Sequence, residues 1–185
     1  MINIKPAIFL VPIITLILVV VMYLSILKNT EHKKEFKRLI LVISVTAFFL
    51  NVAWELLHMP LYKGASYDIQ HISFCALASV ADAEMVLLLY LSFALLNKKP
   101  FWAEDIGFRQ VFILMIIGGI GAIIGEKAHT SAGNWAYADA MPILPFLNVG
   151  LSPVLQFFLL PALIYYLSFY FLRKRSKKET QLLNP

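Results

Sequence analysis

Long apolar runs separated by short polar connections dominate the chain. Five of these runs are long enough to cross about 30 Å of hydrocarbon, which takes about 20 residues of helix each. We predict spans at 7–27, 38–58, 72–96, 108–126 and 150–172. The pattern predicts an all-α membrane protein, a bundle of about five transmembrane helices in a single domain over 1–175. Residues 176–185 are expected to form a flexible cytoplasmic tail.

Composition supports this interpretation, because 60% of the 185 residues are hydrophobic, whereas a soluble domain is nearer half apolar. The first apolar run is long and a strong basic cluster follows it, so we expect a retained anchor and not a signal peptide. Cys75 is the only cysteine, which excludes an intrachain disulfide.

Lys and Arg are distributed unevenly between the two sides of the predicted bundle. Thirteen of the 16 lie around the connections 28–38 and 97–109 and in the tail from 173 onward, and three lie on the other side. Basic residues favour the cytoplasmic side, so we expect the N-terminus outside and the C-terminus in the cytoplasm of the inner (plasma) membrane. The lipid bilayer is the expected partner, and nucleic acid is not.

Four carboxyl groups lie within or at the end of a span: Glu55, Asp82, Glu84 and Glu126. An ionisable group at mid-membrane costs about 2.5–3.5 kcal/mol on insertion scales, and such groups usually mark functional sites. We take Glu55, Asp82 and Glu126 as candidate catalytic residues. Asp82 is eleven residues below His71, about 16 Å and near the midplane. Glu84 is about 200° around the helix from Asp82 and needs a different partner.

Helical spacing places Asn51, Glu55 and His58 on one stripe. Glu55–His58 and Glu126–His129 both read E-x-x-H, which puts a carboxylate beside an imidazole, as metal sites in helix bundles do. The candidate metal ligands are His58, His71, His129, Glu55 and Glu126. A divalent metal is compatible with this pattern but not required. The alternative is that these groups hydrogen-bond one another and lock the bundle.

The two outer connections, 59–71 and 127–149, are aromatic and weakly charged. Their Trp and Tyr residues suit either an aromatic belt in the headgroup layer or a lid over a pocket. Whether 127–149 forms a re-entrant lid or a plain loop stays open. The candidate substrate-binding residues are Asn51, Trp54, Tyr62, Trp135, Tyr137 and Gln156.

Span four carries a face of small residues formed by Gly118, Gly121 and Gly125. The Gly121–Gly125 spacing is that of a G-x-x-x-G pair, which lets another helix approach closely. This face is the expected surface for a helix–helix partner.

Two stretches, WELLHMPLY (54–62) and WAYADAMPILPFLNVGLSPVLQ (135–156), resemble segments that recur in a group of small multi-pass bacterial inner-membrane proteins. The resemblance covers roughly 50–160 and implies a bacterial inner-membrane protein. No activity is established for that group, so no catalytic role transfers. The resemblance draws attention to Trp54, Glu55, Trp135, Tyr137 and Gln156.

The sequence contains no serine-nucleophile motif, P-loop, H-E-x-x-H or dinucleotide fingerprint. We expect an outward-facing acidic, histidine and aromatic site, in an intramembrane or metal-assisted enzyme for a lipid-like or small apolar substrate. One alternative is a scaffold or accessory subunit of a membrane complex. Another is a small transporter or proton-path subunit that uses Asp82 and Glu84, although only Tyr90 and Ser92 continue a polar track toward the cytoplasm.

Overall fold

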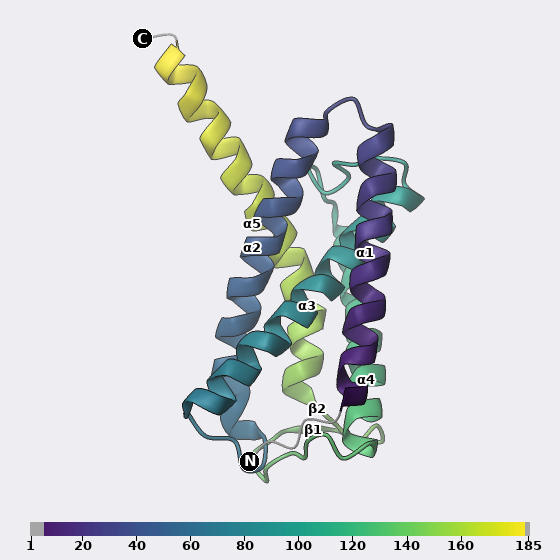
Figure 1. The fold of residues 1–185 in the computed structure, drawn as a ribbon, viewed down its shortest axis with the longest axis vertical. Coiled ribbons are helices and arrows are strands. Elements are labelled where there is room, and N and C mark those ends of the chain that lie inside the picture. The colour runs from purple at the N-terminus through teal and green to yellow at the C-terminus, as the bar shows by residue number, and fades with distance from the viewer. Residues whose placement is uncertain (1–5, 184–185) are drawn as a thin grey trace.

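The computed structural model describes residues 6–183 and shows five long helices in that part of the chain (Figure 1). Their bounds are α1 Leu10–Asn29, α2 Lys33–His58, α3 Ile69–Leu96, α4 Phe108–Ser131 and α5 Leu151–Leu183. Short 3₁₀ turns flank them at η1 Pro6–Phe9 and η2 Met59–Leu61. All five helices are long and apolar enough to cross a membrane. The prediction of five spans is therefore confirmed, and the chain is a multi-pass membrane protein.

Each helix extends beyond its predicted span at one end, because helical hydrogen bonding continues past the apolar window, whereas α1 and α5 begin slightly later than predicted. Helix α2 begins at Lys33 and includes a basic first turn, α4 continues to Ser131, and α5 continues to Leu183. The predicted tail is thus helical as far as Leu183, and its last two residues lie outside the described part. Its flexibility stays a prediction.

The purely α-helical prediction missed a small sheet between α4 and α5. Strand β1, Ile143–Leu144, pairs antiparallel with β2, Val149–Gly150. The turn between them places Phe146 and Asn148 at positive φ. This hairpin ends where α5 begins, and so fixes the entry of α5 into the bundle.

Helix α2 lies at the centre of the packing and contacts both α3 and α5, while α1 packs on α3 and α4 packs on α5. Its buried face follows a spacing of three to four residues through Phe36, Leu39, Ile43 and Ala47. The same face continues to Asn51 and ends near His58, and both are buried. The apolar stripe that packs α2 therefore also carries polar groups into the bundle.

The glycine face predicted on α4 is divided between two environments. A Cβ on Gly118 would lie 2.0 Å from the Phe157 carbonyl oxygen, so Gly118 allows α4 to approach α5 within this chain. At Gly121 and Gly125 no neighbouring atom of the described residues lies within 4 Å of an added Cβ. Only the second part of the face is left open to another helix.

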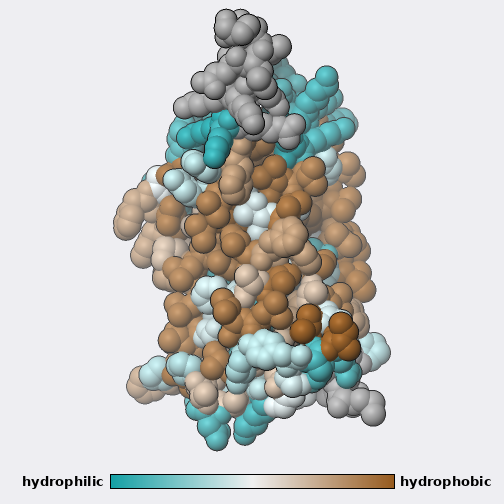
Figure 2. Space-filling view, turned by 90° about the vertical axis from the view of Figure 1, so that its left-hand side faces the viewer, coloured by the Kyte–Doolittle hydropathy of each residue, from teal (hydrophilic) through white to brown (hydrophobic). Residues whose placement is uncertain are grey.

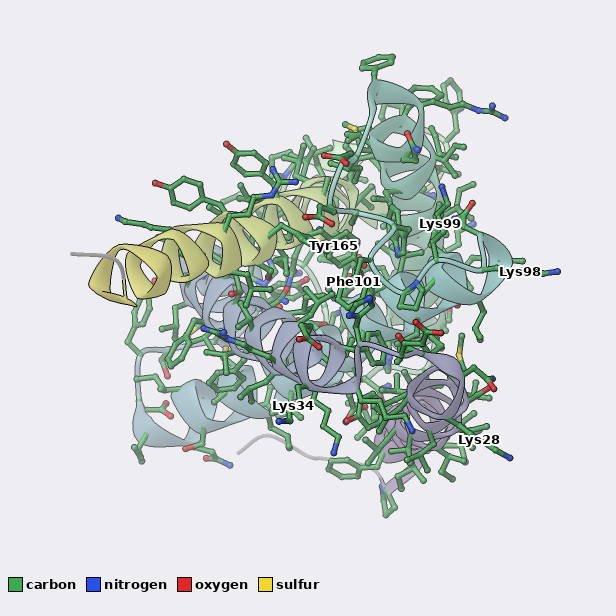
Figure 3. The ribbon with its side chains drawn as sticks, turned by 90° about the horizontal axis from the view of Figure 1, so that it is seen from above. Lys28, Lys34, Lys98, Lys99, Phe101 and Tyr165 are labelled. Carbon is green, nitrogen blue, oxygen red and sulfur yellow. The ribbon has the colours of Figure 1, made fainter. Side chains whose placement is uncertain are left out.

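The two ends of the molecule differ in chemistry. Figure 2 shows hydrophobic side chains across the middle of one face, with hydrophilic residues gathered at both ends. Lys28 and Lys34 flank the connection between α1 and α2, and Lys98 and Lys99 lie in the connection between α3 and α4. Figure 3 looks onto this end of the molecule, which we name the basic end. The connection 97–107 folds onto this end, where the Trp102 indole donates to the Tyr90 carbonyl at 3.0 Å.

The opposite end, which we name the site end, carries the connections 59–68 and 132–150 (Figure 1). These two connections are hydrogen-bonded to each other. The Lys63 amide donates to the Ala136 carbonyl at 2.9 Å, the Ala138 amide donates to the Leu61 carbonyl at 2.9 Å, and Tyr62 bridges Tyr137. Segments far apart in sequence thus form one cover over the ends of α2 and α4.

Candidate functional site

Gln156 joins three helices at one point in the interior. The residue is 1% exposed and lies in the second turn of α5. The Nε2 atom lies 2.9 Å from Asn51 Oδ1, 3.0 Å from Asp82 Oδ2 and 3.3 Å from Glu55 Oε1. An amide nitrogen carries two hydrogens, so it can donate fully to only two of these three acceptors at once.

This contact brings together two of the three candidate catalytic residues. Asp82 comes from α3 and Glu55 from α2, and α3 runs obliquely across α2 (Figure 1). The number of residues between a side chain and the end of its helix therefore cannot be compared directly between α2 and α3. That is why Asp82, predicted near the midplane, meets the same amide as Glu55, which is close to the end of α2.

His58, which is buried, lies between a carboxylate and a hydroxyl group. Its Nε2 is 3.2 Å from Glu55 Oε2, and its Nδ1 is 3.0 Å from Ser152 Oγ. Glu55 is one turn earlier on α2, and Ser152 is the second residue of α5. The packing of α2 on α5 therefore produces a continuous chain from Gln156 through Glu55 and His58 to Ser152.

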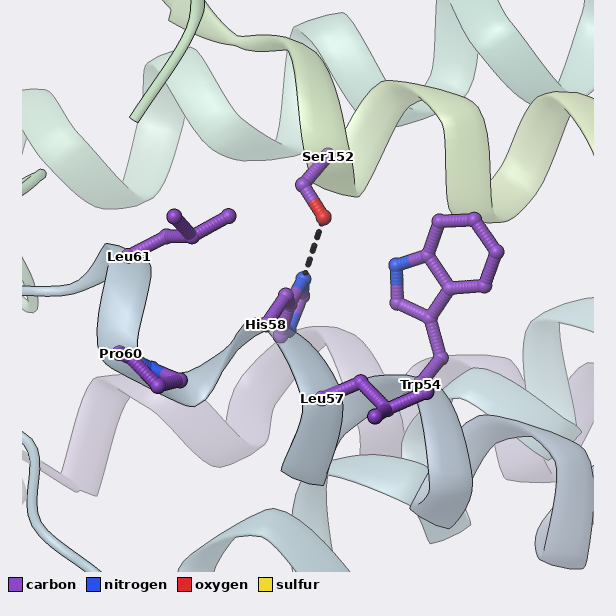
Figure 4. Close-up of a pocket in the computed structure, with 6 residues that line it drawn as sticks. All are labelled: Trp54, Leu57, His58, Pro60, Leu61 and Ser152. Carbon is purple, nitrogen blue, oxygen red and sulfur yellow. Dashed lines mark hydrogen bonds between the residues drawn. The ribbon is translucent and has the colours of Figure 1, made fainter. Parts of the chain in front are cut away.

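A pocket of about 270 Å³ opens beside this chain. Its lining residues are Trp54, Leu57, His58, Pro60, Leu61 and Ser152 (Figure 4). The wall is mostly apolar, and His58 and Ser152 supply its polar atoms. The Trp54 Nε1 atom is buried and has no hydrogen-bond partner in the described part of the chain. Its edge of the indole faces the His58–Ser152 hydrogen bond (Figure 4).

Glu126, the third candidate catalytic residue, lies in a separate aromatic cluster. Its Oε2 accepts hydrogen bonds from the Tyr137 hydroxyl at 2.5 Å and from the Trp135 indole at 3.2 Å. The Tyr62 ring packs 5.7 Å from the Tyr137 ring and 5.3 Å from the His58 ring, measured between centroids. Tyr62 therefore links the Glu126 cluster to the His58 chain.

The surroundings keep the tyrosines of this cluster protonated. Burial, then the neighbouring Glu126 and Glu55, raise the pKa of Tyr62 well above its usual range. Burial and the hydrogen bond to Glu126 likewise raise the pKa of Tyr137. Both tyrosines turn toward the site, as does Trp135, whereas Tyr67 of the expected aromatic belt is exposed. The connection 132–150 thus provides two neutral donors to Glu126, and Tyr62 of the other connection packs beside them.

The structure does not gather the five predicted metal ligands at one point. His71 lies at the start of α3, with Nδ1 2.7 Å from Asp68 Oδ2. His129 stacks on Trp135 at 4.4 Å and pairs with Asn134 at 2.8 Å. Within residues 6–183 no group of three or more His, Cys, Asp or Glu side chains is placed to hold a metal. Metal binding stays a prediction.

Glu84 does not join the Gln156 cluster, and its Oε2 is buried without a hydrogen-bond partner among the described residues.

Ser152 was missed as a site residue, since G-L-S-P matches no nucleophile motif. The available signal was its place at the start of a span carrying Gln156, one turn before that glutamine.

Comparison of the chain with protein-family models, curated proteins and solved structures finds no match. The chemistry of the site therefore provides the basis for a function.

Proposed function

We propose that this protein is a membrane-embedded enzyme that performs acid–base chemistry on a lipid-like or small apolar substrate. The observation that carries the proposal is the His58 imidazole, held between the Glu55 carboxylate and the Ser152 hydroxyl on the wall of an apolar pocket. An imidazole takes up and returns a proton near neutral pH. A carboxylate on its other nitrogen orients the ring.

The Gln156 cluster supports this proposal by bringing a second carboxyl group to the site. Glu55 and Asp82, which come from different helices, both approach the single Gln156 nitrogen. Gln156 therefore holds a second carboxyl group beside the Glu55–His58 pair.

The substrate class follows from the pocket. Leu57, Pro60 and Leu61 present apolar surface at the end of a membrane span. A volume of about 270 Å³ is slightly below the range of about 300–1,000 Å³ that holds a drug-sized ligand. The pocket therefore suits one segment of a lipid, with the remainder of the molecule in the bilayer.

Charge distribution supports an orientation for the site. Thirteen of the 16 basic residues belong to the connections and tail of the basic end, so we propose that this end faces the cytoplasm. The N-terminus and the pocket then face the outer side of the membrane, which we propose to be the inner membrane of a bacterium. A substrate would enter from the outer leaflet or from outside the cell.

A scaffold role remains as a second candidate because Gly121 and Gly125 leave an open surface on α4. Replacing Gly121 with Leu should then disrupt a membrane complex while insertion stays normal. A transporter role gains less support. The Tyr90 and Ser92 hydroxyls below Glu84 already donate to the Pro100 and Leu88 carbonyls.

The proposal is tested by lipid conversion. Full-length protein is placed in nanodiscs made from bacterial lipid extract, and products are followed by mass spectrometry. Glu55→Gln should slow conversion by about 10²–10⁴-fold, the usual contribution of an acid–base group. Glu104→Gln, a matched change at the basic end, should have no effect. Absence of any conversion by the wild type, or equal rates in both variants, would contradict the proposal.

A further inference from the structure

The contacts of Ser152 match those of an activated nucleophile. The order hydroxyl, imidazole, carboxylate is that of a Ser–His–acid triad, with separations of 3.0 Å and 3.2 Å. The serine is on Nδ1 and the carboxylate on Nε2, so the two ring nitrogens exchange their usual places. With the ring hydrogen on Nε2, the imidazole donates to Glu55 and Nδ1 accepts from Ser152. Nδ1 is then free to take the hydroxyl proton.

Two more features of the pocket favour negative charge beside Ser152. The buried Trp54 indole N–H has no acceptor in the described part of the chain, and it faces the His58–Ser152 pair (Figure 4). A buried donor without an acceptor is rare in folded proteins. Ser152 is also in the first turn of α5, where the helix carries partial positive charge. An oxyanion formed on a substrate here would satisfy the indole.

We propose that Ser152 is a catalytic nucleophile and that the pocket hydrolyses a carboxylic ester of a lipid through an acyl-serine. In this assignment His58 is the general base, Glu55 orients it, and Trp54 donates to the oxyanion. The inference rests on the proposed enzyme function and names its reaction. Gln156 has a positioning role, because it donates to Glu55 Oε1 while Oε2 holds His58.

The reaction proceeds in two balanced halves. Ser152 Oγ attacks the ester carbonyl carbon, its proton passes to His58 Nδ1, and the carbonyl oxygen becomes an oxyanion that accepts from the indole. Collapse breaks the carbon–oxygen bond to the alcohol, which leaves with the proton from His58. A water molecule then attacks the acyl-serine and gives its proton to His58. The second collapse breaks the bond between the acyl carbon and Ser152 Oγ, which takes the proton back from His58, and the carboxylic acid is released.

The first test is covalent labelling of the purified full-length protein in nanodiscs with a fluorophosphonate probe. Wild type should gain one adduct, which peptide mapping places on Ser152. Ser152→Ala should gain none, and His58→Gln should react about 10²-fold more slowly or worse. Ser92→Ala is the matched control, because Ser92 donates only to its own helix and does not line the pocket. It should label like the wild type.

The second test measures hydrolysis of a p-nitrophenyl acyl ester. Trp54→Phe keeps the ring and removes the N–H, so kcat should fall by about 10²–10³-fold with KM little changed, as for loss of an oxyanion donor. A purely structural Trp54 predicts an unchanged kcat. If Ser152→Ala fails to fold, Ser152→Cys in a Cys75→Ala background keeps a nucleophile. Its alkylation by iodoacetamide should then depend on His58.

The outcomes separate this inference from the broader proposal. A folded wild type without a Ser152 adduct, or with alkylation of Ser152→Cys that ignores His58, overturns the nucleophile assignment. If Ser152→Ala still converts lipid in a Glu55-dependent manner, the result supports acid–base catalysis and contradicts the acyl-serine mechanism. If the wild type is neither labelled nor able to convert lipid, both proposals are contradicted.

Discussion

Replacing Gln156 with Leu removes the amide that ties α2, α3 and α5 together while keeping a side chain of similar size. The Nε2 atom lies 2.9–3.3 Å from acceptor oxygens of Asn51, Asp82 and Glu55. Its two hydrogens can form two of these hydrogen bonds fully at one time. A hydrogen bond between transmembrane helices contributes about 0.6–2 kcal/mol. Loss of two such bonds is therefore expected to lower the free energy of unfolding by about 1–4 kcal/mol.

The assay is reversible unfolding in mixed micelles, with Ser168→Ala as the control on the same helix. Ser168 is fully buried and donates to the Ile164 carbonyl of its own helix, α5, so its loss removes a hydrogen bond within one helix and not one between helices. A double-mutant cycle of Gln156→Leu with Asp82→Ala should give a coupling energy of about 0.5–3 kcal/mol. Equal destabilisation by Gln156→Leu and Ser168→Ala, or additive effects in the cycle, would refute the bridging role of Gln156.

Two further predictions concern packing and pH. Gly118→Ala places a Cβ 2.0 Å from a carbonyl oxygen of α5 and should destabilise the protein by about 1–3 kcal/mol. Gly121→Ala should leave thermal unfolding in detergent unchanged, and equal shifts would contradict the α4–α5 packing. The Ser66 hydroxyl, then the His71 amide and ring, hold the pKa of Asp68 well below its usual range. Ionised Asp68 therefore stabilises the start of α3 above about pH 4, and this stabilisation is lost as the pH falls. Hydrogen-exchange protection of that turn should fall on acidification in the wild type but not in Asp68→Asn, and parallel profiles would refute the cap.

The spans could be predicted because hydropathy and helical length are properties of one segment at a time. The Asn51–Glu55–His58 stripe was also predictable from spacing, and the structure places all three residues in one hydrogen-bonded system with α5. Partners on other helices were not predictable in detail. The meeting of Asp82 with Glu55 depends on the oblique crossing of α3, which no single-helix count contains.

The partners of the histidines show a second limit of prediction from the sequence. E-x-x-H spacing suggested that His129 faces its own Glu126, whereas it stacks on Trp135 and pairs with Asn134. His71 pairs with Asp68, the N-cap of α3. That D-x-x-H pairing was a local capping signal already present in the sequence. Ser152 joined the site only through the packing of α2 on α5, because G-L-S-P has no chemical meaning until His58 lies opposite it.

The most direct test of the central claim is ester-lipid turnover by wild type and His58→Gln in the same nanodiscs. Within residues 6–183, His58 contacts both the Glu55 carboxylate and the Ser152 hydroxyl, so each proton transfer of the proposed hydrolysis passes through it. We predict measurable hydrolysis by the wild type and a rate at least about 10²-fold lower in His58→Gln. Equal turnover by the two folded proteins would contradict the account.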